Sequence, residues 1–185
     1  MTDTESAGAG DTVREWVRSV VIGHNLCPFA ARELQLGRIR FAVSGATTAN
    51  SLIDDLSDEL ARLADTPSIE TTVLIHPQVL TRFDDYNQFL DAADALVAAM
   101  GFEGVFQIAS FHPDYCFADS DESDSANFTN RSPYPLLHLL REESLSRVIE
   151  QYGDTSQIPE RNVRHLHELG IDEVGRLLRR CSAVR

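Results

Sequence analysis

The chain has 185 residues, 43% of them hydrophobic, which is the size and composition of one domain with an ordinary core. Its formal net charge is −13. All 16 basic residues are arginines, so the chain can form neither a lysine Schiff base nor a phosphate-binding loop of the Walker type with its lysine. The acidic balance argues against a nucleic-acid partner, which would need a basic face, and against long-range attraction of anions.

The three cysteines, Cys27, Cys116 and Cys181, form no Cys-x-x-Cys pair. Their odd number, the lack of a signal-peptide pattern and the shortness of the apolar runs predict a cytoplasmic protein with reduced thiols and no membrane partner. The sequence does not indicate the oligomeric state.

The hydrophobic pattern predicts strands that alternate with helices. Residues 1–10 are small and polar and predict a disordered tail, after which Asp11 can cap a helix that ends near Gly23. The other elements are expected as strands at 38–44, 71–75 and 105–110, and as helices at 52–63, 83–100, 132–152, 159–169 and 172–181.

Strands separated by helices favour parallel crossovers. We therefore predict one α/β domain over residues 11–185, with a small, mostly parallel sheet of about three main strands flanked by helices, and with C-terminal helices. The alternative is a ferredoxin-like α+β fold with an extra antiparallel strand.

Two of the expected strands end at a His-Pro pair, His76-Pro77 and His112-Pro113. Proline cannot continue a central strand, so each strand stops there. If the strands are parallel, both histidines emerge at the same carboxyl edge of the sheet, where open α/β sheets place ligands.

The stretch from 107 to 142 contains the densest group of chemically able side chains. Ser132-Pro133 is typical of a helix start, and a helix N-terminus attracts anions. Arg131 directly precedes it and can hold a carboxylate or phosphate with a two-pronged fork. On such a helix His138 and Glu142 would share one face.

The first functional hypothesis is an enzyme that acts on a small anionic metabolite. One of His112 and His138 would be the acid–base group, with Glu142 or Asp114 orienting it. Cys27 would be a nucleophile if the fold brings it to the same edge, and otherwise a small buried hydrophobe. The expected substrate-binding residues are Arg131, Asn130, Asn127, Ser132, Arg141 and Tyr115.

The second hypothesis is a divalent-metal protein or metal-dependent hydrolase, with candidate ligands His112, Asp114, His138 and Glu142. Such mixed nitrogen and oxygen ligands suit zinc, manganese or iron.

The third hypothesis is a non-catalytic regulatory or assembly module, in which the polar cluster is a buried network that fixes the long loop. The lack of an open cavity beside His112 and Arg131 would favour it. The acidic run 119–124 lacks the ligand spacing of an EF-hand and is interpreted as a flap or a plain loop.

Several long motifs resemble a mainly bacterial family catalogued as domain of unknown function 1415 (DUF1415). They are Asn25-Leu-Cys-Pro-Phe-Ala30, Glu70-Thr-Thr72, Ala109-Ser-Phe-His-Pro-Asp-Tyr115, Asn127-Phe-Thr-Asn-Arg-Ser-Pro-Tyr-Pro135 and His138-Leu-Leu-Arg-Glu142. The resemblance covers roughly residues 13–170 and supplies no reaction. Phe128 stands where the family pattern usually has tyrosine, so no essential phenol is expected there.

Overall fold

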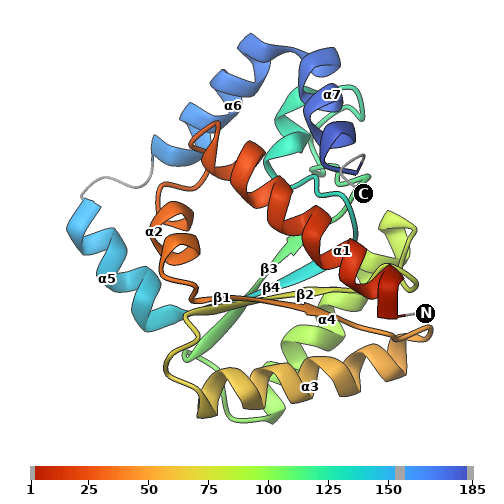
Figure 1. Ribbon diagram of the computed structural model, residues 1–185, viewed down its shortest axis with the longest axis vertical. Coiled ribbons are helices and arrows are strands. Elements are labelled where there is room, and N and C mark those ends of the chain that lie inside the picture. The colour runs from red at the N-terminus through yellow and green to blue at the C-terminus, as the bar shows by residue number, and fades with distance from the viewer. Residues whose placement is uncertain (1–2, 153–156, 183–185) are drawn as a thin grey trace.

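The computed structural model describes residues 3–152 and 157–182 of the chain. It consists of a central sheet between two layers of helices, with α3 and α4 on one side and α1 and α2 on the other (Figure 1). No helix in the described ranges is both long enough and apolar enough to cross a membrane.

The sheet has four strands in the order β1-β2-β4-β3, where β1 is Ile39–Val43, β2 is Thr71–Ile75, β3 is Phe106–Phe111 and β4 is Leu136–Arg141. β1 and β2 are parallel, and β4 is antiparallel to both of its neighbours. The predicted α/β class is confirmed. The prediction of a mostly parallel, three-stranded sheet is corrected, because an antiparallel strand is inserted between two parallel ones.

The main error of the sequence-based prediction concerns β4, because a helix was expected from Ser132 onward. Helices cover both faces of this central strand, so leucines point to both sides, and the strand shows two Leu-Leu pairs around His138 instead of a simple alternation. The helix α5 begins only at Glu142 and extends to Tyr152, and Gly153 lies outside the described residues. No helix N-terminus exists at Ser132, and His138 and Glu142 share no helix face.

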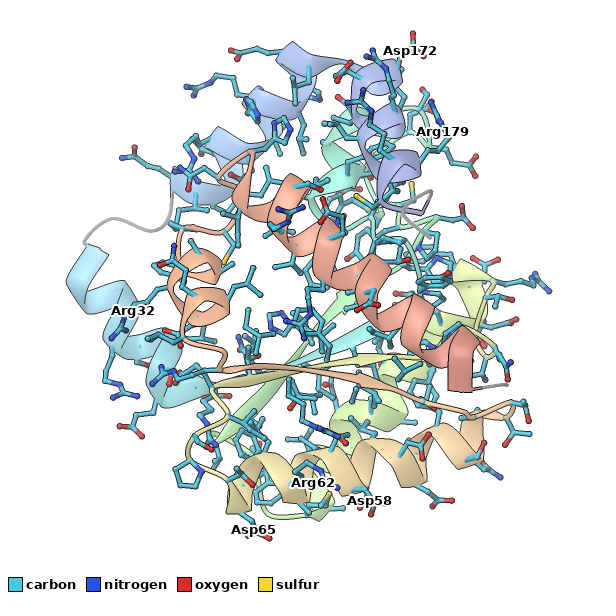
Figure 2. All side chains as sticks on the ribbon, in the orientation of Figure 1. Arg32, Asp58, Arg62, Asp65, Asp172 and Arg179 are labelled. Atoms are coloured by element: carbon cyan, nitrogen blue, oxygen red, sulfur yellow. The ribbon has the colours of Figure 1, made fainter. Side chains whose placement is uncertain are left out.

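The first helical layer consists of α3, Ala49–Asp65, and α4, Phe83–Ala99. Both helices were predicted, and both bury an apolar stripe against the sheet. Asp58, Arg62 and Asp65 lie on the outer side of α3 (Figure 2). The guanidinium of Arg141 donates hydrogen bonds to backbone carbonyls at the end of this helix and just beyond it, those of residues 63, 66 and 69, and so joins β4 to this layer.

The second helical layer begins with α1, Asp3–Trp16, which continues as the π-helical segment η1, Val17–Ile22. The prediction of a disordered tail over 1–10 is wrong from residue 3 onward, and residues 1–2 lie outside the described part. Ala9 is 3% exposed, since small side chains let this helix approach the sheet closely. The layer also contains α2, Ala30–Gln35, and α5.

The C-terminal helices α6, Gln157–Leu169, and α7, Ile171–Ser182, agree with the predicted pair. Gly170 separates them with a φ of 77°, a left-handed conformation that glycine adopts without strain. α6 packs against the 3-10 segment η2, Ser125–Thr129, and α7 against α1. These helices extend the second layer beyond the sheet (Figure 1).

Candidate functional site

The carboxyl edge of β2 and β3 brings His76 and His112 together, as the sequence predicted. Both side chains are 0% exposed, and both rings lie beside the ring of Tyr86, with centroid distances of 5.8 Å and 5.2 Å. The Tyr86 hydroxyl donates to the carbonyl of Leu136 and accepts from the N–H of Phe111. This edge is therefore closed by packing on the side of α4.

The two histidines at this edge are neutral and mostly satisfied by backbone groups. In His112, Nε2 donates to the carbonyl of Leu80 and Nδ1 accepts from the N–H of Asp114. In His76, Nδ1 donates to the carbonyl of Val79, while Nε2 is buried without a partner in the described part of the chain. Burial lowers the pKa of His76 to about 4 and also lowers the pKa of His112. Neither residue lines the cavity of about 240 Å³ on the other face of the sheet.

Arg131, the predicted anion anchor, is hydrogen-bonded to backbone carbonyls of its own loop. Its Nε donates to the carbonyl of Tyr115 at 3.0 Å and its Nη2 donates to the carbonyl of Glu122 at 2.9 Å, while its guanidinium lies over the ring of Phe128. The hydroxyl of Ser132 donates to the carbonyl of Tyr134 instead of capping a helix. The fork of the arginine thus holds the loop that follows β3.

The two asparagines of the predicted binding set have the same structural role. Asn127 is 0% exposed, accepts the N–H of Phe117 and donates to the carbonyl of Asp121. Asn130 donates to the carbonyl of Ser110. These contacts, with those of Arg131, tie down the acidic run 119–124, so this cluster has the geometry of the loop-fixing network.

A cavity of about 240 Å³ lies on the other face of the sheet, between the strands and the layer formed by α1, η1, α2 and α5. Figure 2 shows the side chains of this layer converging toward the sheet. Most of the wall is apolar, with contributions from Val17, Val21, Leu26, Val73, Leu136 and Leu140.

His138 lines this cavity from β4. Its Nε2 lies 2.8 Å from the hydroxyl of Thr71, and that hydroxyl donates its own hydrogen to the carbonyl of Leu139. Since the hydroxyl proton is already used, Nε2 of His138 must be the donor in the contact with Thr71. The remaining ring atom, Nδ1, is then an acceptor, and no described residue donates to it.

The protonation state of His138 follows from its burial. The ring is enclosed by protein, and desolvation lowers its pKa to about 4. The residue as a whole is partly exposed, and it lines the cavity. At neutral pH the pocket therefore contains an uncharged imidazole with one open lone pair.

Cys27 and Trp16 line the same cavity. Cys27 and His138 therefore line one cavity, which is not the carboxyl edge named in the prediction. Within the described ranges, neither the thiol of Cys27 nor the indole N–H of Trp16 has a hydrogen-bond partner. His24, three residues before Cys27, lies against His165, with its Nδ1 3.1 Å from Nε2 of His165.

The charged residues of the cavity wall are all engaged elsewhere. Glu33 and Glu70 both bind the guanidinium of Arg38, at 2.6 Å and 2.7 Å. The third, Arg141, donates to the backbone carbonyls beyond α3. The pocket therefore presents neutral polar groups in an apolar wall and no free charge for an anion.

The predicted metal set is not assembled. His112 lies against α4, whereas His138 lines the cavity on the opposite face of the sheet, and Glu142 begins α5 without lining that cavity. In the part of the chain that the structure describes, no group of three or more His, Cys, Asp or Glu side chains is placed to hold a metal ion.

Sequence reasoning missed Trp16 and Thr71 as members of the site. Trp16 reads as one of the apolar positions of a helix, and Thr71 as the first residue of a buried strand. The one available signal was a hydroxyl residue in a strand that is buried along its whole length. Only the pairing of β2 with β4, in which Thr71 lies opposite Leu140, brings its hydroxyl to His138.

The comparisons with known proteins confirm the family and leave the activity open. The family model described as "Protein of unknown function (DUF1415)" matches residues 9–176, so the chain belongs to this family. The searches of curated proteins and of solved structures found no match. The functional argument therefore depends on the geometry of this chain.

Proposed function

We propose that the protein binds a small, neutral and mostly apolar molecule in the cavity between the sheet and the second helical layer. The observation that carries this proposal is the open lone pair of Nδ1 in a neutral, enclosed His138. A concave, mainly apolar site with few polar groups is the usual form of a small-molecule pocket. The cavity of about 240 Å³ lies just below the usual range of roughly 300–1,000 Å³, which favours a ligand smaller than a typical drug.

The polar groups define the chemistry of the ligand. A hydroxyl or N–H group on the ligand would donate to Nδ1 of His138, and a ligand oxygen would accept from the indole of Trp16. An ionised ligand would lose its hydration without gaining a counter-charge, because Glu33, Glu70 and Arg141 are already paired. The proposal therefore replaces the anionic metabolite of the sequence analysis with a neutral ligand.

The hydrogen bond to His138 can be tested with a matched pair of probes, 1-naphthol and 1-methylnaphthalene, which differ in one donor group. Calorimetric titration of the wild type should show tighter binding of 1-naphthol by about fivefold, the usual net effect of one hydrogen bond. The preference should disappear in His138→Leu. Binding of neither probe to the wild type, or an unchanged preference in the variant, would contradict the proposal.

The location of the pocket can be tested with two neighbouring positions of α2. Ala30 lines the cavity, whereas Ala31 is a half-buried neighbour outside it. Ala30→Phe should fill the cavity and weaken 1-naphthol binding by more than about tenfold, while Ala31→Phe should leave the affinity unchanged. Equal effects of the two substitutions would place the binding site elsewhere.

A further inference from the structure

Cys27 differs from the other two cysteines in its surroundings. The sulfur of Cys116 contacts the carbonyls of Phe117 and Ser120, and that of Cys181 contacts the hydroxyl of Ser19 and the carbonyl of Leu177. The thiol of Cys27 has no such partner in the described part of the chain, is partly accessible and lines the cavity. It is therefore the thiol best placed to meet a bound molecule.

A second, independent feature of the cavity points to a reacting ligand. The enclosed ring of His138 offers an acceptor, Nδ1, that no described residue uses, in the same cavity as the thiol. A thiol and an imidazole acceptor that line one cavity are the two groups that acyl transfer to sulfur needs.

The backbone around Cys27 is held in place from α6. Asn162 is 8% exposed and donates from Nδ2 to the carbonyl of Leu26 at 2.7 Å, and Arg161 donates to the carbonyl of Asn25 at 2.7 Å. Asn25 itself has a φ of 53°, a left-handed conformation that asparagine tolerates in turns. These contacts position the Cys27 segment beneath the helical layer.

We propose that Cys27 is a nucleophile that accepts the acyl group of a small, neutral, apolar ester or thioester bound in this cavity. This inference depends on the proposed function, because the same cavity must bind the acyl group. The sulfur forms a bond to the carbonyl carbon and the bond from that carbon to the leaving oxygen or sulfur breaks. The thiol proton ends on the leaving group, carried by Nδ1 of His138, and the product is an acyl thioester on Cys27.

The charges in the cavity wall are compatible with this step. Negative charge develops on the carbonyl oxygen of the ester as sulfur adds. Glu33 and Glu70 would oppose this charge if they were free, but both are bound to Arg38. The indole N–H of Trp16 is an unpaired donor in the same wall.

The test uses the full chain and p-nitrophenyl butyrate, a neutral ester whose leaving group is coloured. Intact-mass measurement and peptide mapping should find butyryl groups on Cys27 at a rate about tenfold or more above that on Cys116. Cys27→Ser should abolish the rapid phase of p-nitrophenolate release, and Cys116→Ser should retain it. His138→Leu should slow acylation of Cys27, and saturating 1-naphthol should slow it in the wild type.

The outcomes separate this inference from the proposed function. If 1-naphthol binds and Cys27 is not acylated faster than Cys116, the pocket is a binding site and the nucleophile assignment is wrong. If Cys27 is acylated equally fast in the wild type and in Ala30→Phe, the thiol reacts from solvent and the inference is also wrong. If the wild type does not bind 1-naphthol, the proposed function fails, whatever the acylation result.

Discussion

The two faces of the sheet bury histidines in different ways. On the face covered by α3 and α4, His76 and His112 are packed against Tyr86 and do not line the cavity of about 240 Å³, even though Nε2 of His76 has no partner in the described residues. On the other face, His138 is equally neutral but adjoins a cavity. The difference teaches that an unpaired buried atom indicates a ligand site only where space for a ligand accompanies it.

The strand β4 contributes to both faces and allows the sharpest comparison of packing. Leu139 is 0% exposed in the core under α3 and α4, whereas Leu140 is half-buried and lines the cavity. Leu139→Ala should lower the free energy of unfolding by about 3 kcal/mol, because it leaves a new void in dense packing. Leu140→Ala should cost about 1 kcal/mol, because its side chain already adjoins empty space. Urea unfolding measures both, and equal losses would contradict the contrast between the faces.

Acid should destabilise the folded protein through one buried histidine on each face of the sheet, over the same pH range. Burial holds the pKa of His76 and His138 at about 4, below the ordinary value of 6.5, so the unfolded chain binds more protons between these pH values. Stability should therefore fall as the pH is lowered from 6.5 toward 4, by on the order of 3 kcal/mol for each histidine.

The variant His138→Leu divides this acid response between the two faces. Between pH 6.5 and 4, this variant should lose the part of the fall in unfolding free energy that is due to His138. It should keep the part that is due to His76. Urea unfolding at several pH values checks this expectation. A slope identical to that of the wild type would show that His138 is not held neutral.

Thr71→Val tests the contact that orients the imidazole of His138. The substitution removes the acceptor of the Nε2 proton, and an unpaired buried N–H costs about 1–3 kcal/mol. The freed ring can also take the other tautomer, which should reduce the preference for 1-naphthol over 1-methylnaphthalene. Thr71→Ser keeps the hydroxyl and is the control that should retain the preference.

The smallest effect on ligand binding is expected from a substitution of Arg131, the residue predicted to bind a ligand at the carboxyl edge of the sheet. Arg131→Gln should loosen the acidic loop, because it removes donors to the carbonyls of Tyr115 and Glu122. It should leave the 1-naphthol affinity within about twofold of the wild type, because Arg131 does not line the cavity of about 240 Å³. A loss of binding as large as that expected for Ala30→Phe would favour the edge as the ligand site.

The sequence predicts most of the scaffold, because local signals mark it. The strands β1 to β3 are bounded by glycine or proline, and α3 and α4 bury one clear apolar stripe. Local signals do not identify β4, since a strand buried on both faces is as rich in leucine as a buried helix. That single misassignment also produced the anion site at Ser132 and the pairing of His138 with Glu142.

The candidate site depends on contacts that no local pattern encodes. Arg131, Asn127 and Asn130 are residue types that bind ligands, but a long loop needs the same side chains to satisfy its own backbone. Cys27 and His138 were both named as candidates, and the condition that they meet was left open. They line one cavity because α1 and α2 cross the sheet face to which β4 contributes His138.

The measurement that tests the central claim most directly is long-range proton–nitrogen NMR of the histidine side chains during titration with 1-naphthol. The account expects His138 as the neutral tautomer with its proton on Nε2, and a change in the Nδ1 resonance as the ligand binds. The resonances of His76 and His112 should not move. A shift at His76 or His112 with none at His138 would contradict the account and return the ligand site to the carboxyl edge.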